Sequence, residues 1–289
     1  IFNILEKRGQ KLYNVDNIKK EGKILEKNLI LKKMPKFFVE ETQVNKGIIT
    51  IEGKDVNHIK NVLRKKEKDE IEICIMPENK EEKGKDTISE ILEIKEESIK
   101  CKIKEYEEKD VEGNIEVTIY QGLPKSDKME LVIQKSTELG VYKIAPVEMK
   151  RCVVKLKGKD AEKKVARWQK ISEVAAKQCG RSIIPQIKEI TTIESICRNI
   201  QDFNKVIVAY EEEKEKNLKT ELKQLKEILK TDEVLKIAIV IGPEGGIDYS
   251  EIEQLEKAGA SIVTLGKRIL RTETVALNVL SNIMYEFTE

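Results

Sequence analysis

Residues 235–247 read LKIAIVIGPEGGI, an apolar run that passes directly into a loop with three glycines, a proline and a glutamate. A run of this kind is typical of a strand buried on both faces, as in a parallel sheet. The loop lacks the glycine spacing of GxGxxG and the lysine of GxxxxGK[ST], so neither common phosphate-binding loop is present. On its own, VIGPEGGI (240–247) is either a ligand site or a plain strand-to-helix turn.

The surrounding sequence predicts an α/β domain over residues 111–289, because apolar strands alternate with helical stretches. Ligands in such domains bind at loops beyond the carboxyl ends of strands, which favours the ligand-site interpretation of 240–247. Glu244 disfavours a phosphate, so a neutral or positively charged ligand fits the loop better. The strands predicted to form a mainly parallel sheet are IEVTIYQG (115–122), KIAPVEM (143–149), NKVIVAY (204–210) and LKIAIVIG (235–242).

Helix boundaries in this domain are marked by capping residues. Ser126 is placed to cap the helix that ends before Gly140. Asp248 and Glu251 form a capping-box pair for a helix that ends before Gly259. We therefore expect one helix directly after 240–247.

Residues 34–110 have the pattern of half-buried antiparallel strands, since apolar and charged residues alternate in GIITIEG, DEIEICIM, DTISEILEI and SIKCKIKEYEE. One helical stretch, DVNHIKNVLRKK (55–66), interrupts them. This pattern predicts a small β-barrel or sandwich with one short helix. Residues 1–33 are polar and lysine-rich without apolar periodicity, and we expect an extension outside the fold, with MPKFF (34–38) as the natural start.

Composition limits the possible functions. The net charge is +2, but residues 1–33 hold nine basic and four acidic residues, so the remainder is slightly acidic. A polyanionic partner must therefore bind local basic patches. Membrane-length apolar runs and a signal-peptide pattern are both lacking, and the five cysteines form no CxxC pair. We expect a cytoplasmic protein with free thiols, no metal site and no membrane contact.

Several motifs, in order, resemble one family. GPEGG (242–246) and LGKRILRTET (265–274) are similar to the signature of SPOUT-class RNA methyltransferases. MPKFFVE (34–40), HIKNVLR (58–64), GLPK (122–125) and AAKQCGR (175–181) narrow the resemblance to the RsmE family of that class. The resemblance implies a PUA-like β-barrel, a trefoil-knotted α/β domain that dimerises, S-adenosylmethionine as cofactor, and methylation of N3 of a uridine in small-subunit (16S) ribosomal RNA.

The resemblance also implies which residues bind the cofactor. Backbone groups of 242–246 and 265–270 are expected to contact its adenine and ribose, and AYEE (209–212) is expected to add a wall. Glu244 is either a polar partner of the cofactor or a residue that stabilises the loop. The predicted cofactor-binding residues are Tyr210, Gly242, Pro243, Glu244, Gly245, Gly246, Leu265, Gly266, Ile269, Leu270 and Thr274.

Methylation at N3 of uracil requires that the imide proton be lost, so positive charge or a base must favour the anion. Arg271 is the predicted catalytic residue for this electrostatic role, with Glu273 as its polar partner. The alternative for Arg271 is a structural ion pair with Glu273. No residue stands out as a general base.

Basic patches are the candidate RNA contacts, one around 58–66 and one at KRCVVKLKGK (150–159). Arg181 is predicted to face either the substrate or a dimer interface. An apolar last helix predicts a buried or dimer-forming element. The predicted RNA-binding residues are His58, Arg64, Lys65, Lys125, Arg151 and Arg181.

Three alternatives remain at this point. The same fold could serve a non-catalytic RNA-binding protein, or a methyltransferase that acts on another RNA. A Rossmann-like enzyme for a small molecule would explain the glycine loop, but it leaves the β domain and the basic patches unexplained.

Overall fold

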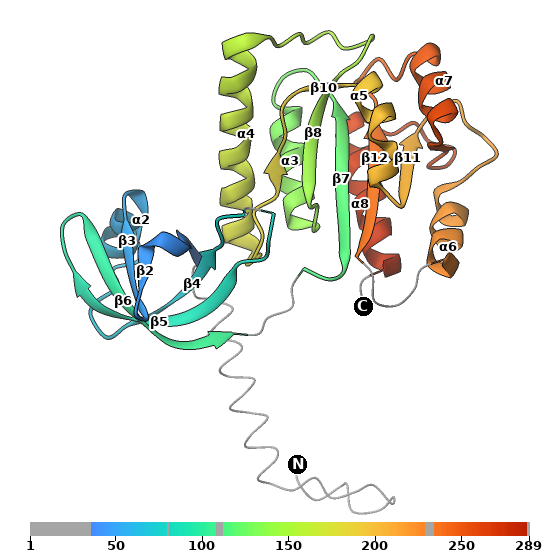
Figure 1. Cartoon of the computed structure of the whole chain (residues 1–289). Helices are drawn as coiled ribbons and strands as arrows, with labels where there is room; N and C mark the ends of the chain where they lie inside the picture. The colour runs from blue at the N-terminus through green and yellow to red at the C-terminus, as the bar shows by residue number, and fades with distance from the viewer. Residues whose placement is uncertain (1–35, 80, 108–111, 229–233, 288–289) are drawn as a thin grey trace, which may run out of the picture.

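The computed structural model describes residues 36–79, 81–107, 112–228 and 234–287. These residues form two units, a curled six-stranded sheet and a seven-stranded parallel sheet covered by helices (Figure 1). The predicted extension at 1–33 lies outside the described residues.

The curled sheet encloses its own apolar core, with Phe37, Ile59 and Ile73 almost completely buried. Four of its five strand pairs are antiparallel, as predicted. The first pair is parallel, which corrects the all-antiparallel expectation, because a long crossover separates these two strands in the chain. In spatial order the strands are β1 (Lys36–Glu40), β4 (Glu70–Met76), β5 (Lys85–Ile94), β6 (Ser98–Glu107), β3 (Ile48–Glu52) and β2 (Val44–Asn45).

The predicted helical break in this sheet is confirmed, although it is short and irregular. It consists of α2 (Lys54–Asn57) and a π-helical turn, η2 (His58–Val62), which follow a short 3-10 turn, η1 (Glu41–Gln43), earlier in the chain. Val56 and Ile59 point into the core, which leaves the polar and basic residues of this segment on the outside.

The second sheet is parallel throughout its described pairings, which confirms the predicted α/β class. The four strands predicted from the apolar runs all form, with ends shifted by at most one residue. In spatial order the strands are β10 (Thr191–Thr192), β8 (Lys143–Glu148), β7 (Ile115–Gly122), β12 (Leu235–Ile241), β11 (Lys205–Ala209) and β13 (Ser261–Val263), and β9 (Gln186–Ile187) also pairs with β8.

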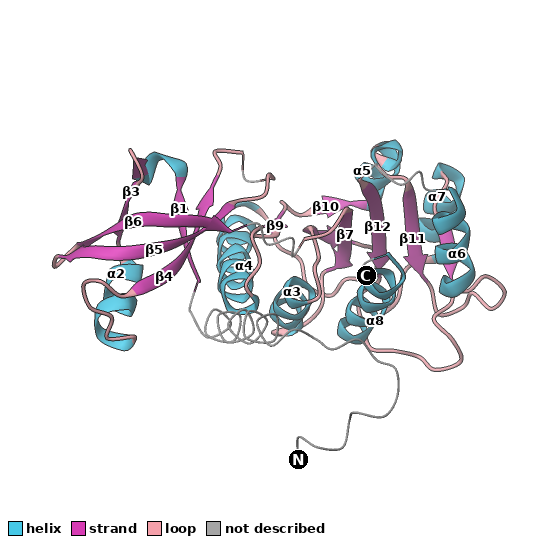
Figure 2. Ribbon diagram, turned by 90° about the horizontal axis from the view of Figure 1, so that it is seen from below, coloured by secondary structure: helices cyan, strands magenta, loops and turns pink. Residues whose placement is uncertain are grey.

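Helices cover both faces of this sheet (Figure 2). One layer contains α3 (Lys128–Glu138), α4 (Gly158–Cys179) and α8 (Thr272–Phe287), and the opposite face carries α5 (Ile193–Arg198) and α7 (Tyr249–Ala258). The 3-10 turn η3 (Ile200–Asp202) follows α5, and α6 (Leu218–Ile228) contacts α8. The chain thus returns from β13 at the sheet edge to place α8 against the central strands β7 and β12. The trefoil knot itself stays a prediction.

Two helix starts test the capping predictions. Asp248 and Glu251 form the predicted capping box at α7, and Gly259 ends that helix with φ of +109°. At α3 the N-cap is Asp127 rather than Ser126, and its side chain makes no capping hydrogen bond. Ser126 instead takes a left-handed conformation with φ of +56° in the turn before the helix.

Candidate active site

A cavity of about 390 Å³ lies at the carboxyl ends of β11 and β12. Most of its wall consists of residues 209–211, 241–244, 246 and 264–271, while α3 contributes Lys128 and α8 contributes Thr272 and Val275. The strand-to-helix loop at 240–247 is therefore part of a ligand-sized cavity, rather than a plain turn.

Close packing leaves no room for side chains at two glycines of this loop. A Cβ on Gly242 would lie 2.9 Å from Cγ1 of Ile247 and 3.0 Å from the carbonyl carbon of Gly246. Gly246 has φ of +72°, and a Cβ there would collide with the carboxylate of Glu211. Its amide donates to the carbonyl oxygen of Pro243 at 3.0 Å, which closes the turn. The wall at this point is consequently formed by backbone atoms.

Thr272 joins the last helix to the glycine loop. Its hydroxyl donates to the carbonyl oxygen of Gly242 at 2.7 Å and accepts from Nε2 of Gln121 at 2.8 Å. Both side chains are buried, Gln121 at the end of β7 and Thr272 at the start of α8. Sequence reasoning missed both residues, since a Thr or Gln at an element end has no distinctive pattern.

A lysine on α3 links two carboxylates at the cavity. Nζ of Lys128 lies 2.8 Å from Oε1 of Glu244 and 3.8 Å from Oε2 of Glu273. The amide of Lys125 also donates to Oε1 of Glu244, at 3.0 Å. Burial alone would raise the pKa of Glu244, but the hydrogen bond from Lys128 and the backbone amides outweigh it and hold that pKa below 4.5. Glu244 therefore fixes the loop as an ionised carboxylate.

Arg271 lies at the wall of the cavity and is exposed to solvent. Glu273 is only 14% exposed at its side chain, and among the described ion pairs its partner is Lys128 rather than Arg271. Oε2 of Glu273 is buried without a hydrogen-bond partner among the described residues. This geometry does not favour the alternative of an Arg271–Glu273 structural pair.

Most of the predicted cofactor-binding residues surround the cavity. Two do not line it. Gly245 faces the other way, and a Cβ there would lie 3.3 Å from Cβ of Arg151. Thr274 is exposed on the first turn of α8, where its amide donates to the carbonyl oxygen of Arg271 at 2.8 Å. The residues that line the cavity as predicted are Tyr210, Gly242, Pro243, Glu244, Gly246, Leu265, Gly266, Ile269 and Leu270.

The remaining lining residues were not predicted individually, although Ala209 and Glu211 belong to the wall segment predicted at 209–212, and Lys267 and Arg268 belong to the stretch predicted at 265–270. Lys128 and Glu211 supply charge of opposite sign to the wall, and Ile241 and Val275 supply apolar surface. Lys128 follows the GLPK motif in the loop beyond β7, so its neighbourhood was recognised in the sequence. Nothing in the sequence, however, showed that this loop lies beside Glu244. The other lining residues that were not predicted individually are Ala209, Thr264, Lys267, Arg268 and Thr272.

Five of the six predicted RNA-binding residues have their side chains at least partly accessible. His58 and Arg64 are exposed at the helical break, His58 edge-on to the ring of Phe37 with 5.8 Å between centroids. Lys65 is half-buried, with Nζ 3.1 Å from the carbonyl oxygen of Glu70. The remaining two exposed residues are Lys125 and Arg151, and Arg151 Nη1 lies 3.3 Å from the carbonyl oxygen of Gly245.

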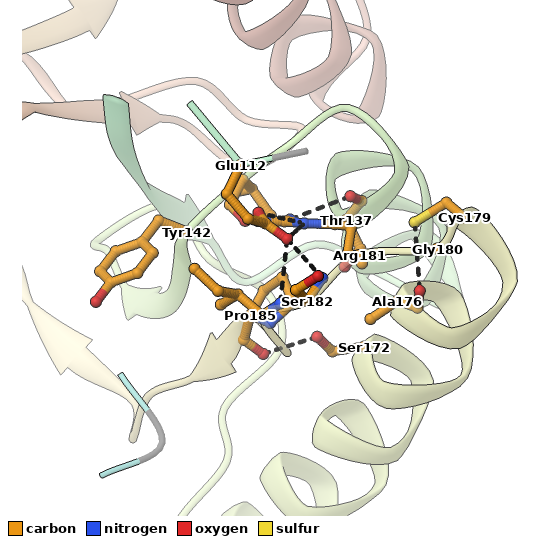
Figure 3. A network of polar contacts seen from close by, with 12 residues as sticks. Glu112, Thr137, Tyr142, Ser172, Ala176, Cys179, Gly180, Arg181, Ser182 and Pro185 are labelled. Carbon is orange, nitrogen blue, oxygen red and sulfur yellow. Dashed lines mark hydrogen bonds and ion pairs between the residues drawn. The ribbon is translucent and has the colours of Figure 1, made fainter. Parts of the chain in front are cut away.

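Arg181 requires a correction. It is 6% exposed and forms an ion pair with Glu112, in which Nη2 lies 2.6 Å from Oε2 (Figure 3). Its Nη1 donates to the carbonyl oxygens of Val141 and Thr137 at 2.6 and 3.2 Å. Because these contacts enclose the guanidinium, a phosphate cannot reach it, and Arg181 has an internal structural role instead.

Among the described residues, no group of three or more His, Cys, Asp and Glu side chains is placed to hold a metal ion. None of the described helices combines the length and apolarity needed to span a membrane. All five cysteines are free thiols.

Comparison with known proteins agrees with this site. A family described as "RNA methyltransferase domain" matches residues 111–284, which include every lining residue of the cavity. The chain belongs to the RNA methyltransferase family. An RNA methyltransferase PUA domain family also matches residues 51–79, in the curled sheet of this methyltransferase.

Curated relatives align with this methyltransferase over nearly their whole length. "Ribosomal RNA small subunit methyltransferase E" of Bacillus subtilis is 36% identical over 88% of this chain and 97% of its own. The protein of that name from Mesomycoplasma hyopneumoniae is 33% identical over 86% of this chain and 98% of its own.

Solved structures show the same architecture. A methyltransferase of that name from Neisseria gonorrhoeae, bound to S-adenosyl methionine, is 29% identical, with a TM-score of 0.72. The alignment covers 87% of this methyltransferase and 97% of that protein. A putative methyltransferase from Legionella pneumophila, also with bound cofactor, is 26% identical over 88% of this chain and 98% of its own, with a TM-score of 0.72.

Proposed function

We propose that this chain methylates N3 of a uridine in small-subunit ribosomal RNA, with S-adenosylmethionine as methyl donor. The observation that carries the proposal is the cavity at the carboxyl ends of the parallel strands, with a side-chain-free glycine wall and Arg271 at its edge. The names of the full-length relatives support a ribosomal RNA substrate, and the cofactor in the two related structures supports the methyl donor.

The residues of the cavity fit such a cofactor. Its volume of about 390 Å³ falls in the range of small-molecule sites. Tyr210, Leu265 and Leu270 supply apolar surface for an adenine ring, while the backbone at Gly242 and Gly246 allows close approach. Carboxylates of Glu211 and Glu244 suit a ligand with hydroxyls and positive charge. When bound, S-adenosylmethionine supplies a methyl group that its sulfonium has already activated.

The chain itself has to bind and polarise the uracil. Loss of the N3 proton places negative charge on the two carbonyl oxygens, and a fixed cation nearby favours that anion. Arg271 is exposed at the cavity wall, and the Lys128 ammonium adds positive charge to the same wall. Glu244 and Glu273 already hold Lys128, whereas Lys267, Arg268 and Arg271 line the cavity with exposed side chains that form no ion pair among the described residues. Of these three we assign the electrostatic role to Arg271.

We assign phosphate contacts to the accessible basic residues outside the cavity. His58, Arg64 and Lys65 belong to the helical break of the curled sheet, whereas Lys125 and Arg151 adjoin the loop at 240–247. Lysines and arginines on such surfaces bind nucleic acid through phosphate contacts that release counterions.

A homodimer is part of this proposal. Ala276, Val279 and Ile283 of α8 are buried within the chain. Most of the apolar surface predicted for the last helix therefore packs inside the protein. Three apolar side chains in the layer of α3, α4 and α8 are nevertheless exposed, Leu131 by 42%, Val174 by 57% and Tyr285 by 86%. We place the dimer contact at this layer, and we place the enzyme in the cytoplasm, where ribosomal RNA is found.

Two measurements test the proposal. Titration calorimetry with S-adenosylmethionine should show one site per chain, and a folded chain that does not bind the cofactor would favour a non-catalytic RNA-binding protein. Mass spectrometry of small-subunit rRNA from cells with and without the gene should then locate one N3-methyluridine that depends on the gene. A gene-dependent methyl group only on another RNA would redirect the substrate assignment.

A further inference from the structure

We propose that a buried polar network locks the curled sheet domain onto the methyltransferase domain, so that the RNA contacts of both domains act as one rigid surface. Lys36, Ser182 and Arg181 are positioning residues in this proposal, because they touch neither cofactor nor base. The inference rests on the proposed RNA substrate, and the experiment below separates the failure of either one.

Lys36, at the start of β1, is the centre of the network. Its side chain is 2% exposed, and Nζ lies 2.9 Å from Oδ2 of Asp86 and 3.4 Å from Oε1 of Glu72 in the same sheet. The same Nζ donates to the carbonyl oxygens of Gly180 and Arg181 at 3.0 and 3.2 Å. One buried ammonium thus binds both domains.

The segment after α4 makes further hydrogen bonds to the curled sheet. The hydroxyl of Ser182 lies 2.6 Å from Oδ2 of Asp86, and the carbonyl oxygen of Ser182 accepts from the amide of Gly84 at 2.9 Å. Ser182 is completely buried. These two bonds and those of Lys36 connect β1 and β5 to a single turn of the other domain.

Arg181 and Glu112 hold that turn in place (Figure 3). Oε1 of Glu112 accepts from the amides of Ser182 and Ile183 at 2.8 and 3.1 Å, while its Oε2 pairs with Arg181. Arg181 in turn donates to carbonyl oxygens at the end of α3 and just beyond it. The turn at 180–183 is therefore fixed on the methyltransferase side by contacts that do not involve Lys36.

Two further contacts lie away from the network. At the end of α4, Nζ of Lys177 is 3.0 Å from Oδ2 of Asp55 and 5.8 Å from the ring centroid of Phe38. Asp55 belongs to α2, so this ion pair holds the segment that leads into His58 and Arg64.

The second contact involves the loop between β4 and β5. Oε1 of Glu81 lies 2.9 Å from Nζ of Lys143 and 3.0 Å from Nζ of Lys188. The hydroxyl of Tyr142 donates to the carbonyl oxygen of Glu81 at 2.7 Å. With three separate contacts between the domains, a hinge motion would have to break the buried hydrogen bonds of Lys36 and Ser182 together with the partly exposed ion pairs of Lys177 and Glu81.

The cost of burying charges makes this network a poor device for stability alone. Desolvation offsets most of the attraction in a buried ion pair. The ion pair still requires one particular arrangement of its partners, and so it fixes the geometry of the junction. When two RNA-binding patches lie on one rigid body, binding of an RNA to the first patch gives the second patch a high effective concentration of the same RNA. A flexible connection between the domains lowers that effective concentration. Loosening the junction should therefore weaken RNA binding without changing either patch.

The experiment compares Lys36→Met and the milder Ser182→Ala with Lys104→Met in the full-length chain. Lys104 is a matched control, because it also pairs with a carboxylate of the curled sheet, Glu90 at 2.7 Å, but on the surface. Each variant is examined by thermal melting, cofactor calorimetry, amide hydrogen exchange of 180–184, and binding of small-subunit rRNA from cells that lack the gene.

We expect Lys36→Met to speed amide exchange at 182–183 and to raise the Kd for rRNA about tenfold, with a shallower salt dependence. Ser182→Ala should do the same to a smaller extent. Cofactor affinity per folded molecule should stay within twofold of wild type in every variant, and Lys104→Met should match wild type throughout.

Three results would overturn the inference. The first is unchanged exchange at 182–183 in Lys36→Met. The second is a lower melting temperature in both junction variants while the folded protein keeps wild-type rRNA affinity, since that marks a purely stabilising network. The third is a control variant that loses as much rRNA affinity as Lys36→Met. If wild-type protein binds the cofactor but no rRNA, the proposed substrate fails, and the proposed role of the junction in RNA binding fails with it, whatever the exchange data show about the network.

Discussion

The hydroxyl of Thr272 donates a 2.7 Å hydrogen bond to the carbonyl oxygen of Gly242, thirty positions earlier in the chain. Through this bond the first turn of α8 fixes the conformation of the glycine loop. Gln121 completes the arrangement by donating to the same hydroxyl at 2.8 Å. The cavity wall thus depends on a contact between the ends of two elements that the sequence does not place together.

Thr272→Val should destabilise the protein by about 1–3 kcal/mol. The carbonyl oxygen of Gly242 and Nε2 of Gln121 would both lose their hydrogen bond to the Thr272 hydroxyl, while the side-chain volume stays nearly constant. Cofactor affinity should fall in the folded fraction as well, since the carbonyl of Gly242 can reorient. Urea unfolding and calorimetry measure the two effects. Thr272→Ser keeps the hydroxyl and is the control; equal losses in both variants would contradict the hydrogen-bond argument.

Gly246→Ala should abolish or strongly reduce cofactor binding, because its φ of +72° disfavours a side chain and the new Cβ would displace the carboxylate of Glu211. Gly259→Ala is the matched control, since Gly259 has φ of +109° but open space around it. Both variants should lose stability in thermal melts, whereas only the first should lose affinity in calorimetry. Wild-type affinity in Gly246→Ala would contradict the prediction, and an equal loss of affinity in both variants would assign the effect to backbone strain rather than to the collision with Glu211.

Arg271→Ala should lower single-turnover methyl transfer by roughly two to three orders of magnitude, about 3–4 kcal/mol, as expected for loss of one electrostatic donor. Raising the pH should partly restore the rate, because more of the uracil is then already deprotonated. Cofactor affinity should change far less. A rate within threefold of wild type would remove Arg271 from the catalytic assignment, and a loss of stability without recovery at high pH would indicate a structural role.

The contact between Glu244 and Lys128 should make the loop sensitive to acid. The pKa of Glu244 lies below its ordinary value of 4.5 in the folded chain, so its contribution to stability is present above that value. The contribution is lost as the pH falls through the lower folded pKa. Melting temperatures of wild type and Glu244→Gln should therefore differ at pH 6 and converge in strong acid. A constant difference over that whole range would show that the charge of Glu244 does not stabilise the loop.

Arg64→Ala should weaken binding to rRNA and reduce the slope of log K against log salt by about one unit, the effect of one lost phosphate contact. Arg64 is exposed at the helical break, and the cavity lies in the other domain, so cofactor affinity should be unaffected. Lys104→Ala serves as a surface control in the same sheet. Unchanged rRNA affinity in Arg64→Ala would mean that this basic segment is exposed to solvent and does not contact the RNA.

Local patterns predicted the elements well, because apolar periodicity and capping residues are properties of neighbouring positions. The strand 235–241 and the capping box of Asp248 are examples. Ser126 shows the limit, since the turn before α3 takes a left-handed conformation that moves the N-cap to Asp127.

Long-range contacts could not be predicted from the sequence. Nothing around Arg181 indicates that Glu112 and two carbonyl groups enclose it, so a basic residue beside a helix end was interpreted as an RNA contact. Lys128 was overlooked for the same reason, because its importance comes from Glu244, more than a hundred residues later in the chain. Gly245 was grouped with its neighbours, although only the folded loop shows which of these glycines faces the cavity.

The return of α8 to the middle of the sheet also determines when the cavity can exist during synthesis of the protein. The glycine loop leaves the ribosome before Thr272 does, and until then the carbonyl of Gly242 lacks its hydrogen-bond donor. The apolar face of α8 is likewise needed to cover β7 and β12. A nascent chain that ends before α8 therefore has an incomplete cofactor site, so the enzyme gains its activity only after α8 has been synthesised.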